Sequence, residues 1–140
     1  MIYELVEHND YVYVCTGFGI VLLDVKNQEI KDTYIIGNNT SQIKVWDVHI
    51  GGDSIYAATE NGIKTASLLS PFLSDPTAWN FIDNPCNKLF TSFEKIYGAE
   101  SNRFLMYNPN SLDTSILVDY NNGLWDTIFM DTVYNINNVK

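Results

Sequence analysis

The sequence predicts an all-β protein made of repeated four-stranded antiparallel units, on the strength of three observations. A short phrase, clearest at residues 55–63, recurs along the chain around a marker tyrosine. The marker tyrosines Tyr13, Tyr56, Tyr97 and Tyr134 follow one another at intervals of 43, 41 and 37 residues, close to the roughly 40 to 50 residues of one propeller blade. Short apolar runs alternate with turns rich in Gly, Pro, Asn and Asp, whereas no run keeps helical spacing for the length of a helix. We therefore predict a partial β-propeller of about three and a half four-stranded blades.

The copies of the phrase also show which positions are constrained. A branched aliphatic residue always precedes the tyrosine, as suits a half-buried strand. Two small or slim residues follow the first three tyrosines: Val14-Cys15, Ala57-Ala58 and Gly98-Ala99. Because propeller sheets stack face to face about 10 Å apart, we expect these small residues to lie between neighbouring sheets.

We place the first blade at residues 1–42 and the second at residues 43–86. Asn61-Gly62, in the second blade, is a strong hairpin signal because a type I′ turn needs positive φ. Gly17-Phe18-Gly19 is the matching turn of the first blade. The expected strands are 2–7, 11–16, 20–25 and 30–36 in the first blade, and 44–50, 54–59, 63–68 and 79–82 in the second.

The third blade is placed at residues 87–122 and a partial fourth blade at residues 123–140. Expected strands of the third blade are 88–93, 95–100, 104–107 and 115–120. The fourth blade is expected to begin with strands 124–130 and 132–136. A single β-sandwich is the rival architecture, but it does not account for the repetition of whole four-strand units.

The chain is expected to be a propeller fragment, a segment of a larger protein. Propellers close with four to eight blades, and an open array leaves unpaired strand edges that invite association. We therefore expect the rest of its own propeller to be a partner. We also expect the isolated chain to associate in solution.

Composition excludes some function classes. The chain has 140 residues, of which 46% are hydrophobic and 14% aromatic, and its net charge is −9 from 17 acidic and 8 basic residues. Arg103 is the single arginine. This charge argues against nucleic acid as a partner, because Lys and Arg dominate phosphate binding. No apolar run approaches the 18 or so residues of a membrane span, and the first residues do not resemble a signal peptide.

The sequence offers no cofactor site, metal site or catalytic constellation. His8 and His49 have no second histidine or cysteine at ligand spacing, and no phosphate-binding loop or nucleophile motif is present. Cys15 occupies a small inward position of the repeat, so we interpret it as a core thiol. A disulfide with Cys86 would have to bridge two blades, and we do not expect one.

Two aromatic–acidic pairs, Trp46-Asp47 and Trp125-Asp126, are the candidate site residues. They stand ten and nine residues before a marker tyrosine, at the start of a blade's first strand, which is not the place of the dipeptide that marks WD40 repeats. One interpretation is structural, with the ring packed between blades and the acid near the axial channel. The other interpretation is a set of channel-mouth contacts that recognise a partner.

Several segments resemble the N-terminal β-propeller of PorZ-type proteins of the type IX secretion system. They are TGFGIVLLDV at 16–25, EIKDTY at 29–34, SQIKV at 41–45, DSIYAATENGI at 53–63 and PFLSDPTAW at 71–79. The resemblance covers residues 1 to about 82. The same hairpin pattern occurs in the propeller repeats of two-component regulators.

The resemblance implies a non-enzymatic, exported protein at the cell surface or in the periplasm. It implies a scaffold that supports the delivery of anionic lipopolysaccharide to the sortase, with these two as partners. A sensor propeller of a two-component regulator is a second hypothesis. A carbohydrate-binding or enzymatic propeller is a third, for which Trp46, Trp125, Asp47 and Asp126 are the candidate residues.

Overall fold

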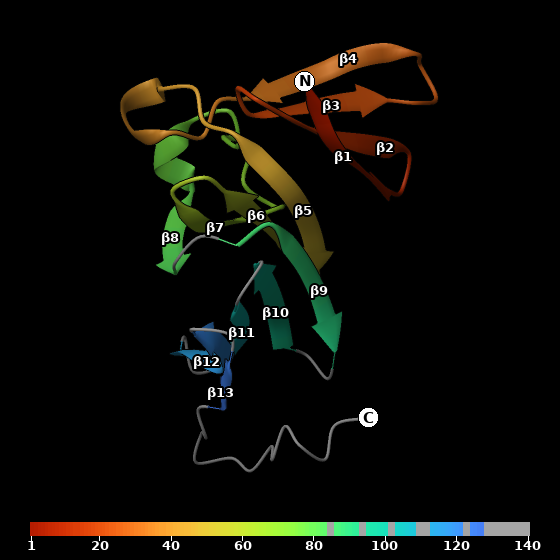
Figure 1. Cartoon of the computed structure of the whole chain (residues 1–140). Helices are drawn as coiled ribbons and strands as arrows, with labels where there is room; N and C mark the ends of the chain where they lie inside the picture. The colour runs from red at the N-terminus through yellow and green to blue at the C-terminus, as the bar shows by residue number, and fades with distance from the viewer. Residues whose placement is uncertain (84–85, 93–94, 101–102, 109–112, 122–123, 128–140) are drawn as a thin grey trace.

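The structure is a computed structural model of the whole chain, and it describes residues 1–83, 86–92, 95–100, 103–108, 113–121 and 124–127. Three antiparallel sheets follow one another along the chain (Figure 1). The all-β prediction and the partial propeller are confirmed. Among the described residues, no helix has the length and hydrophobicity needed to cross a bilayer.

The first sheet has the strand order β1-β2-β3-β4. Its marker residue Tyr13 lies opposite Val6 on one side and Leu22 on the other. The turn into β3 depends on Gly19, whose φ is +151° and whose Cβ, if present, would lie 2.2 Å from the Tyr34 carbonyl oxygen. Its strands are β1 (Ile2–His8), β2 (Tyr11–Thr16), β3 (Ile20–Asp24) and β4 (Glu29–Tyr34).

The second sheet repeats this arrangement in the order β5-β6-β7-β8. Thr16 and Thr59 end the second strand of their sheets, and each hydroxyl donates to the carbonyl of the glycine three residues later, Gly19 at 2.8 Å and Gly62 at 2.5 Å. A threonine at the same position therefore closes both hairpins. The elements are η1 (Asn38–Thr40), β5 (Val45–Gly51), β6 (Ser54–Thr59), β7 (Gly62–Ser67), η2 (Pro76–Ala78) and β8 (Asn80–Asp83).

The third sheet differs from the prediction because it has five strands, in the order β13-β12-β11-β10-β9. Residues 124–130 were expected to open a fourth blade. Instead β13 pairs with β12, with Asn121 opposite Leu124. The two residues between them in sequence are Asn-Gly, the dipeptide that most favours a tight hairpin. The expected strand 132–136 lies outside the described residues. The strands are β9 (Lys88–Ser92), β10 (Lys95–Glu100), β11 (Arg103–Asn108), β12 (Asp113–Asn121) and β13 (Leu124–Thr127).

The first strands of the sheets lie next to one another, β1 beside β5 and β5 beside β9 (Figure 1). Two apolar clusters fill the space between the sheets. The first cluster, between the first and second sheets, includes Tyr13, Cys15, Val48 and Ala57. The second cluster, between the second and third sheets, consists of Tyr56, Ala58, Ile63, Cys86, Leu89 and Ile96.

The small residues after each tyrosine are explained by this stacking. Ala57 and Ala58 are fully buried, and they face opposite sides of the second sheet, one in each cluster. At Gly98 an added Cβ would lie 3.0 Å from the Cys86 sulfur, tighter than ordinary van der Waals contact. The expectation that small side chains allow neighbouring sheets to approach is confirmed.

Candidate channel-mouth site

The site begins with an irregularity that two sheets share. In β1 the register shifts between Ile2, opposite Thr16, and Glu4, opposite Cys15, so Tyr3 is an extra residue. In β5 it shifts between Val45, opposite Thr59, and Asp47, opposite Ala58, and Trp46 is the extra residue. A β-bulge re-aims the side chains around it and strengthens the local twist. The aromatic position of the repeat is therefore a bulge position.

The two bulge residues contact each other across neighbouring sheets. Tyr3 and Trp46 pack edge to face, with ring centroids 4.7 Å apart and an interplanar angle of 62°. The Lys44 ammonium lies 5.7 Å from the centroid of the Trp46 ring. An aromatic pair of this kind contributes about 0.5–1.5 kcal/mol beyond its buried area. Trp46 is half-buried and also packs on the second cluster, so it contacts both Tyr3 of the first sheet and the apolar cluster between the second and third sheets.

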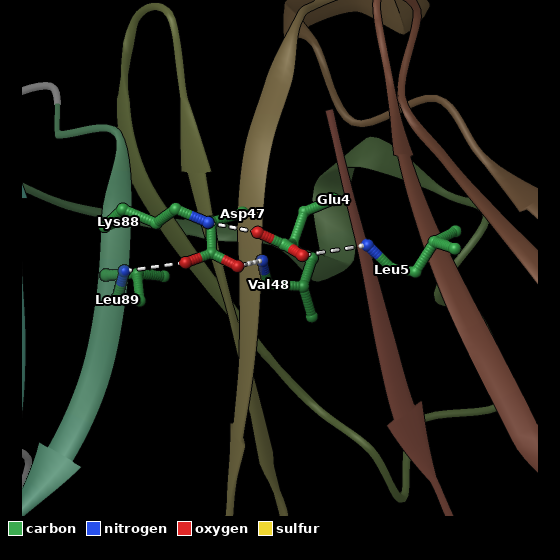
Figure 2. A network of polar contacts seen from close by, with 6 residues as sticks. All are labelled: Glu4, Leu5, Asp47, Val48, Lys88 and Leu89. Carbon is green, nitrogen blue, oxygen red and sulfur yellow. Dashed lines mark hydrogen bonds and ion pairs between the residues drawn. The ribbon is translucent and has the colours of Figure 1, made fainter. Parts of the chain in front are cut away.

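Asp47 joins the second sheet to the third. Its side chain is 6% exposed. The Leu89 N–H donates to Oδ2 at 2.9 Å, and the Val48 N–H donates to Oδ1 at 2.9 Å (Figure 2). β5 and β9 are the edge strands of their sheets. The Asp47 carboxylate accepts hydrogen bonds from backbone N–H groups of these two edge strands, the role that a neighbouring strand has in the middle of a sheet. Burial raises the pKa of Asp47, and the hydrogen bond from Leu89 opposes that rise.

An ion pair connects the first and third sheets. Lys88 on β9 donates to Glu4 Oε2 on β1, and the other oxygen of Glu4 accepts from the Leu5 N–H at 3.3 Å (Figure 2). The hydrogen bond between the Lys88 and Glu4 side chains lowers the pKa of the Glu4 carboxyl and raises the pKa of the Lys88 ammonium. The side chains keep 57% (Lys88) and 34% (Glu4) exposure. An ion pair that water reaches to this extent contributes about 1 kcal/mol or less.

Glu4, Asp47 and Lys88 occupy one register position of the repeat. Each lies opposite the second small residue of its sheet: Cys15, Ala58 and Ala99 respectively. Each first strand therefore contributes one ionisable side chain at the same level. The Tyr3-Glu4 match was visible in the sequence, but the third sheet has Lys88 where the others have an acid, and nothing in the repeat signalled it.

The structure does not bring the two predicted pairs together. Trp46 and Asp47 lie on β5, between the first and third sheets. Trp125 and Asp126 lie on β13, opposite Tyr120 and Asp119, at the edge of the third sheet that is farthest from β9. Their side chains are outside the described residues, so a channel-mouth contact by Trp125 and Asp126 stays a prediction.

Sequence reasoning missed Lys64, a lysine on β7 that is 6% exposed. Its ammonium donates to the Ile36 carbonyl at 2.6 Å and to Asn38 Oδ1 at 3.2 Å, so it ties the second sheet to the segment that leads out of the first. Burial lowers its pKa. It stands where the first sheet has Val21, and no motif distinguishes it.

Cys15 and Cys86 are buried, and His49 is half-buried. The two thiols pack in separate clusters, and no disulfide joins them. Burial, reinforced by the charge of Asp47, raises the pKa of Cys15 to about 12. Burial lowers the pKa of His49. Within the part of the chain that the structure describes, no group of three His, Cys, Asp or Glu side chains is placed to hold a metal ion.

Solved structures with the same fold include PorZ, an essential surface component of the type IX secretion system of Porphyromonas gingivalis, at a TM-score of 0.68 and 23% identity. That match covers 85% of this chain and 16% of the PorZ chain. The extracellular domain of the putative one-component system BT4673 from B. thetaiotaomicron has a TM-score of 0.68 at 12% identity, covering 86% of this chain and 17% of its own. These similarities establish the propeller fold.

The comparison with curated proteins gave no match. A protein-family model, the PorZ N-terminal β-propeller domain of the type IX secretion system, matches residues 1–80. These residues include β1 to β7, the bulges at Tyr3 and Trp46, and Asp47. Because the match covers more than half of the chain, it defines the family. The chain belongs to the PorZ N-terminal β-propeller family of the type IX secretion system.

Proposed function

We propose that this chain is a non-enzymatic propeller scaffold of a cell-surface accessory of type IX secretion. In this proposal it supports the delivery of anionic lipopolysaccharide to the sortase, which joins it to secreted cargo. Membership of the PorZ family supports the assignment to this secretion system. The corresponding location is outside the cytoplasm, at the cell surface or in the periplasm.

The scaffold role is supported by the contacts that Trp46 and Asp47 make with neighbouring sheets. Both oxygens of Asp47 accept backbone N–H groups, one from each of two sheets. Trp46 packs against Tyr3 and the second cluster. Trp46 and Asp47, two of the four residues that sequence reasoning offered for chemistry, are therefore engaged in joining sheets. A site built this way holds the blades in a fixed relation and presents their loops to a partner.

The charge distribution favours a protein partner for this segment over direct contact with the glycan. A surface with a net charge of −9 repels an anionic polymer. Lys64 is buried, and the exposed Lys88 is held by Glu4. We therefore assign to this segment contact with the remaining blades of its own propeller and with the sortase, while glycan contact falls to other parts of a longer protein.

A sensor propeller of a regulator is the second candidate. It is supported by the BT4673 extracellular domain, whose fold is as similar as that of PorZ. At 12% identity that similarity concerns the fold alone, whereas the family model matches the sequence itself over residues 1–80. The secretion accessory is the better supported function for this reason.

The proposal is tested by removing the gene from a bacterium that has a type IX system and following one secreted cargo protein. We expect the cargo to lose its lipopolysaccharide modification and to move from the cell surface to the medium. A gene copy carrying Asp47→Ala should restore less modified cargo than one carrying Asp53→Ala, an exposed turn residue. Cargo that stays modified without the gene refutes the secretion role. Altered transcription with normal cargo would favour the sensor.

A further inference from the structure

The connection between the first and second sheets contains a strained turn at residues 37–41, which we call the junction turn. Asn39 and Thr40, in η1, have positive φ angles of +53° and +61°. Asparagine tolerates this left-handed conformation, whereas for a β-branched residue such as threonine it is a genuine outlier. Both residues are exposed, and the Thr40 hydroxyl donates to the Asn39 carbonyl oxygen at 2.6 Å. Thr40 is therefore held in an unfavourable conformation without filling space in the core.

Two contacts hold the junction turn in this shape. Gly37 has no side chain, and an added Cβ would lie 2.2 Å from the Ser41 carbonyl oxygen, so the ends of the turn approach closely. From the second sheet, the buried Lys64 donates to the Ile36 carbonyl and to Asn38 Oδ1. Both acceptors are uncharged, and burying an ammonium against neutral partners is costly. A strained threonine and a costly lysine thus converge on one exposed turn.

An exposed aromatic residue lies beside this lysine. Phe81 on β8 is the strand partner of Lys64, and paired residues lie on the same face of a sheet. Phe81 is 62% exposed. η2 leads into β8 and contacts η1. Because β8 is the strand of the second sheet farthest from β5 (Figure 1), these elements lie at the outer rim. We call the junction turn, η2 and Phe81 the rim surface.

The two segments that form the rim surface are uncharged. Residues 37–42 and 76–82 contain no Asp, Glu, Lys or Arg, although 18% of the chain is charged. Asp75, at the margin, accepts hydrogen bonds from the N–H and hydroxyl of Thr77. Cores of protein interfaces are depleted in charged residues and enriched in aromatic ones, and a rigid contact loop loses less entropy on binding. The rim surface therefore matches the core of a protein interface.

Further blades of the propeller cannot occupy this surface. Blades stack face to face, and the first and second sheets already pack on each other through the first cluster. The rim surface lies at the outer margin of that junction, since its turn connects the two sheets and Phe81 belongs to the second. A further blade would have to pack on the far face of another sheet. The occupant is therefore a molecule outside the propeller.

We propose that the rim surface is the contact site for a folded protein partner, with Phe81 as its apolar anchor and Lys64 as the residue that positions the junction turn. Under the proposed function, on which this assignment rests, that protein is the sortase. The Phe81 ring enters an apolar pocket of the partner, and the exposed polar groups of Asn39 and Thr40 supply hydrogen bonds around it. Because the rim segments are uncharged, the contact depends little on salt.

The first test measures binding of the purified sortase of the same bacterium to the purified protein by biolayer interferometry. Phe81→Ser should raise the dissociation constant about tenfold or more. Thr40→Gly should raise it about threefold or more without lowering the melting temperature, because glycine accepts positive φ. The matched control is Val25→Ser, which changes an apolar residue that is 56% exposed in the turn between β3 and β4 and should bind like wild type.

Two results of this binding test overturn the proposal. One is equal binding by wild type and Phe81→Ser, or no binding by wild type. The other is a dissociation constant that rises more than about threefold between about 50 and about 500 mM NaCl, because a contact made by charges elsewhere would be screened in this way.

The positioning role of Lys64 needs a control for stability. Lys64→Met should loosen the junction turn and raise the dissociation constant about threefold or more. Ala58→Leu overpacks the second cluster, on the opposite face of the second sheet, and should bind like wild type at a temperature where circular dichroism shows both variants folded. Equal weakening by the two substitutions would mean that binding follows stability, and it refutes the positioning role.

Cells separate the failure of this site from the failure of the proposed function. If deleting the gene leaves cargo modification unchanged, the proposed function is wrong. If deletion abolishes modification and a gene copy carrying Phe81→Ser restores it as fully as wild type, the rim surface alone is refuted. Self-association of the purified protein that Phe81→Ser abolishes, measured by light scattering, would assign the surface to a second copy and also refute the proposal.

Discussion

Asp47 provides the sharpest test of how the sheets are joined. Replacing it with alanine leaves the Val48 and Leu89 N–H groups without their acceptor. An unsatisfied buried donor costs about 1–3 kcal/mol. Removing the buried carboxylate also removes its desolvation cost. We therefore expect Asp47→Ala to lower the unfolding free energy by an amount near the lower end of the range for two donors, about 2–4 kcal/mol. At about 3 °C per kcal/mol for a domain of this size, the melting temperature should fall by about 6–12 °C.

Thermal and urea melts of the chain measure this effect. Asp47→Asn should cost less, about 1–2 kcal/mol, because its carbonyl oxygen still accepts from one of the two donors. Asp53→Ala is the matched control, since Asp53 is an exposed turn residue, and it should cost less than about 0.5 kcal/mol. If Asp47→Ala and Asp53→Ala melt together, the carboxylate does not hold the sheets and the reasoning is refuted.

Three further changes probe other contacts. Ala58→Leu should overpack the second cluster and cost about 1–3 kcal/mol in a urea melt, while the same leucine placed at exposed Lys26 should cost almost nothing; equal melts would contradict the packing. The pKa of Glu4 is lowered from 4.5, so the stability from its pair with Lys88 is present above pH 4.5 and is lost as the pH falls below it. Glu4→Gln should therefore lower the unfolding free energy by up to about 1 kcal/mol at pH 7 and not at all at pH 2. The pairing is refuted if wild type and Glu4→Gln differ in unfolding free energy by the same amount at both pH values. The pKa of Lys64 is lowered from 10.5, so with rising pH the folded state releases this proton before the unfolded state does. The unfolding free energy measured in urea melts should therefore rise with pH just below pH 10.5, and Lys64→Met should lose this rise. An equal rise in both proteins would show that Lys64 is not its source.

Local pattern was sufficient to locate the strands. The middle strands at 11–16, 54–59 and 95–100 have the bounds that the sequence predicted, because each contains the marker phrase and, in the first two, a glycine turn follows. The family resemblance, seen up to about residue 82, agrees with a family match over residues 1–80. Strand bounds depend on near neighbours in the chain, and the sequence displays those directly.

Pairing between distant segments was harder to predict. β13 joins β12 in the third sheet, whereas the repeat alone suggested a new blade. The Asn-Gly pair before Leu124 is a hairpin signal in the sequence, but the repeat period predicts the start of a new blade at the same place. The structural interpretation placed the Trp46 ring between blades, and its packing against Tyr3 agrees with this. The hydrogen bond from Leu89 to Asp47 could not be predicted, because Leu89 belongs to a neighbouring sheet and lies 42 positions away in the sequence. No local pattern carries that information.

The ion pair between Glu4 and Lys88 makes the sheets of this chain non-interchangeable. Glu4 and Asp47 place an acid at the shared register position, and Lys88, 84 residues from Glu4, carries the opposite sign. Transplanting either the first or the third sheet into the place of the other would therefore set like charges against each other. A repeat that looks uniform in its apolar pattern thus carries, in one side chain of each first strand, information on where each sheet belongs.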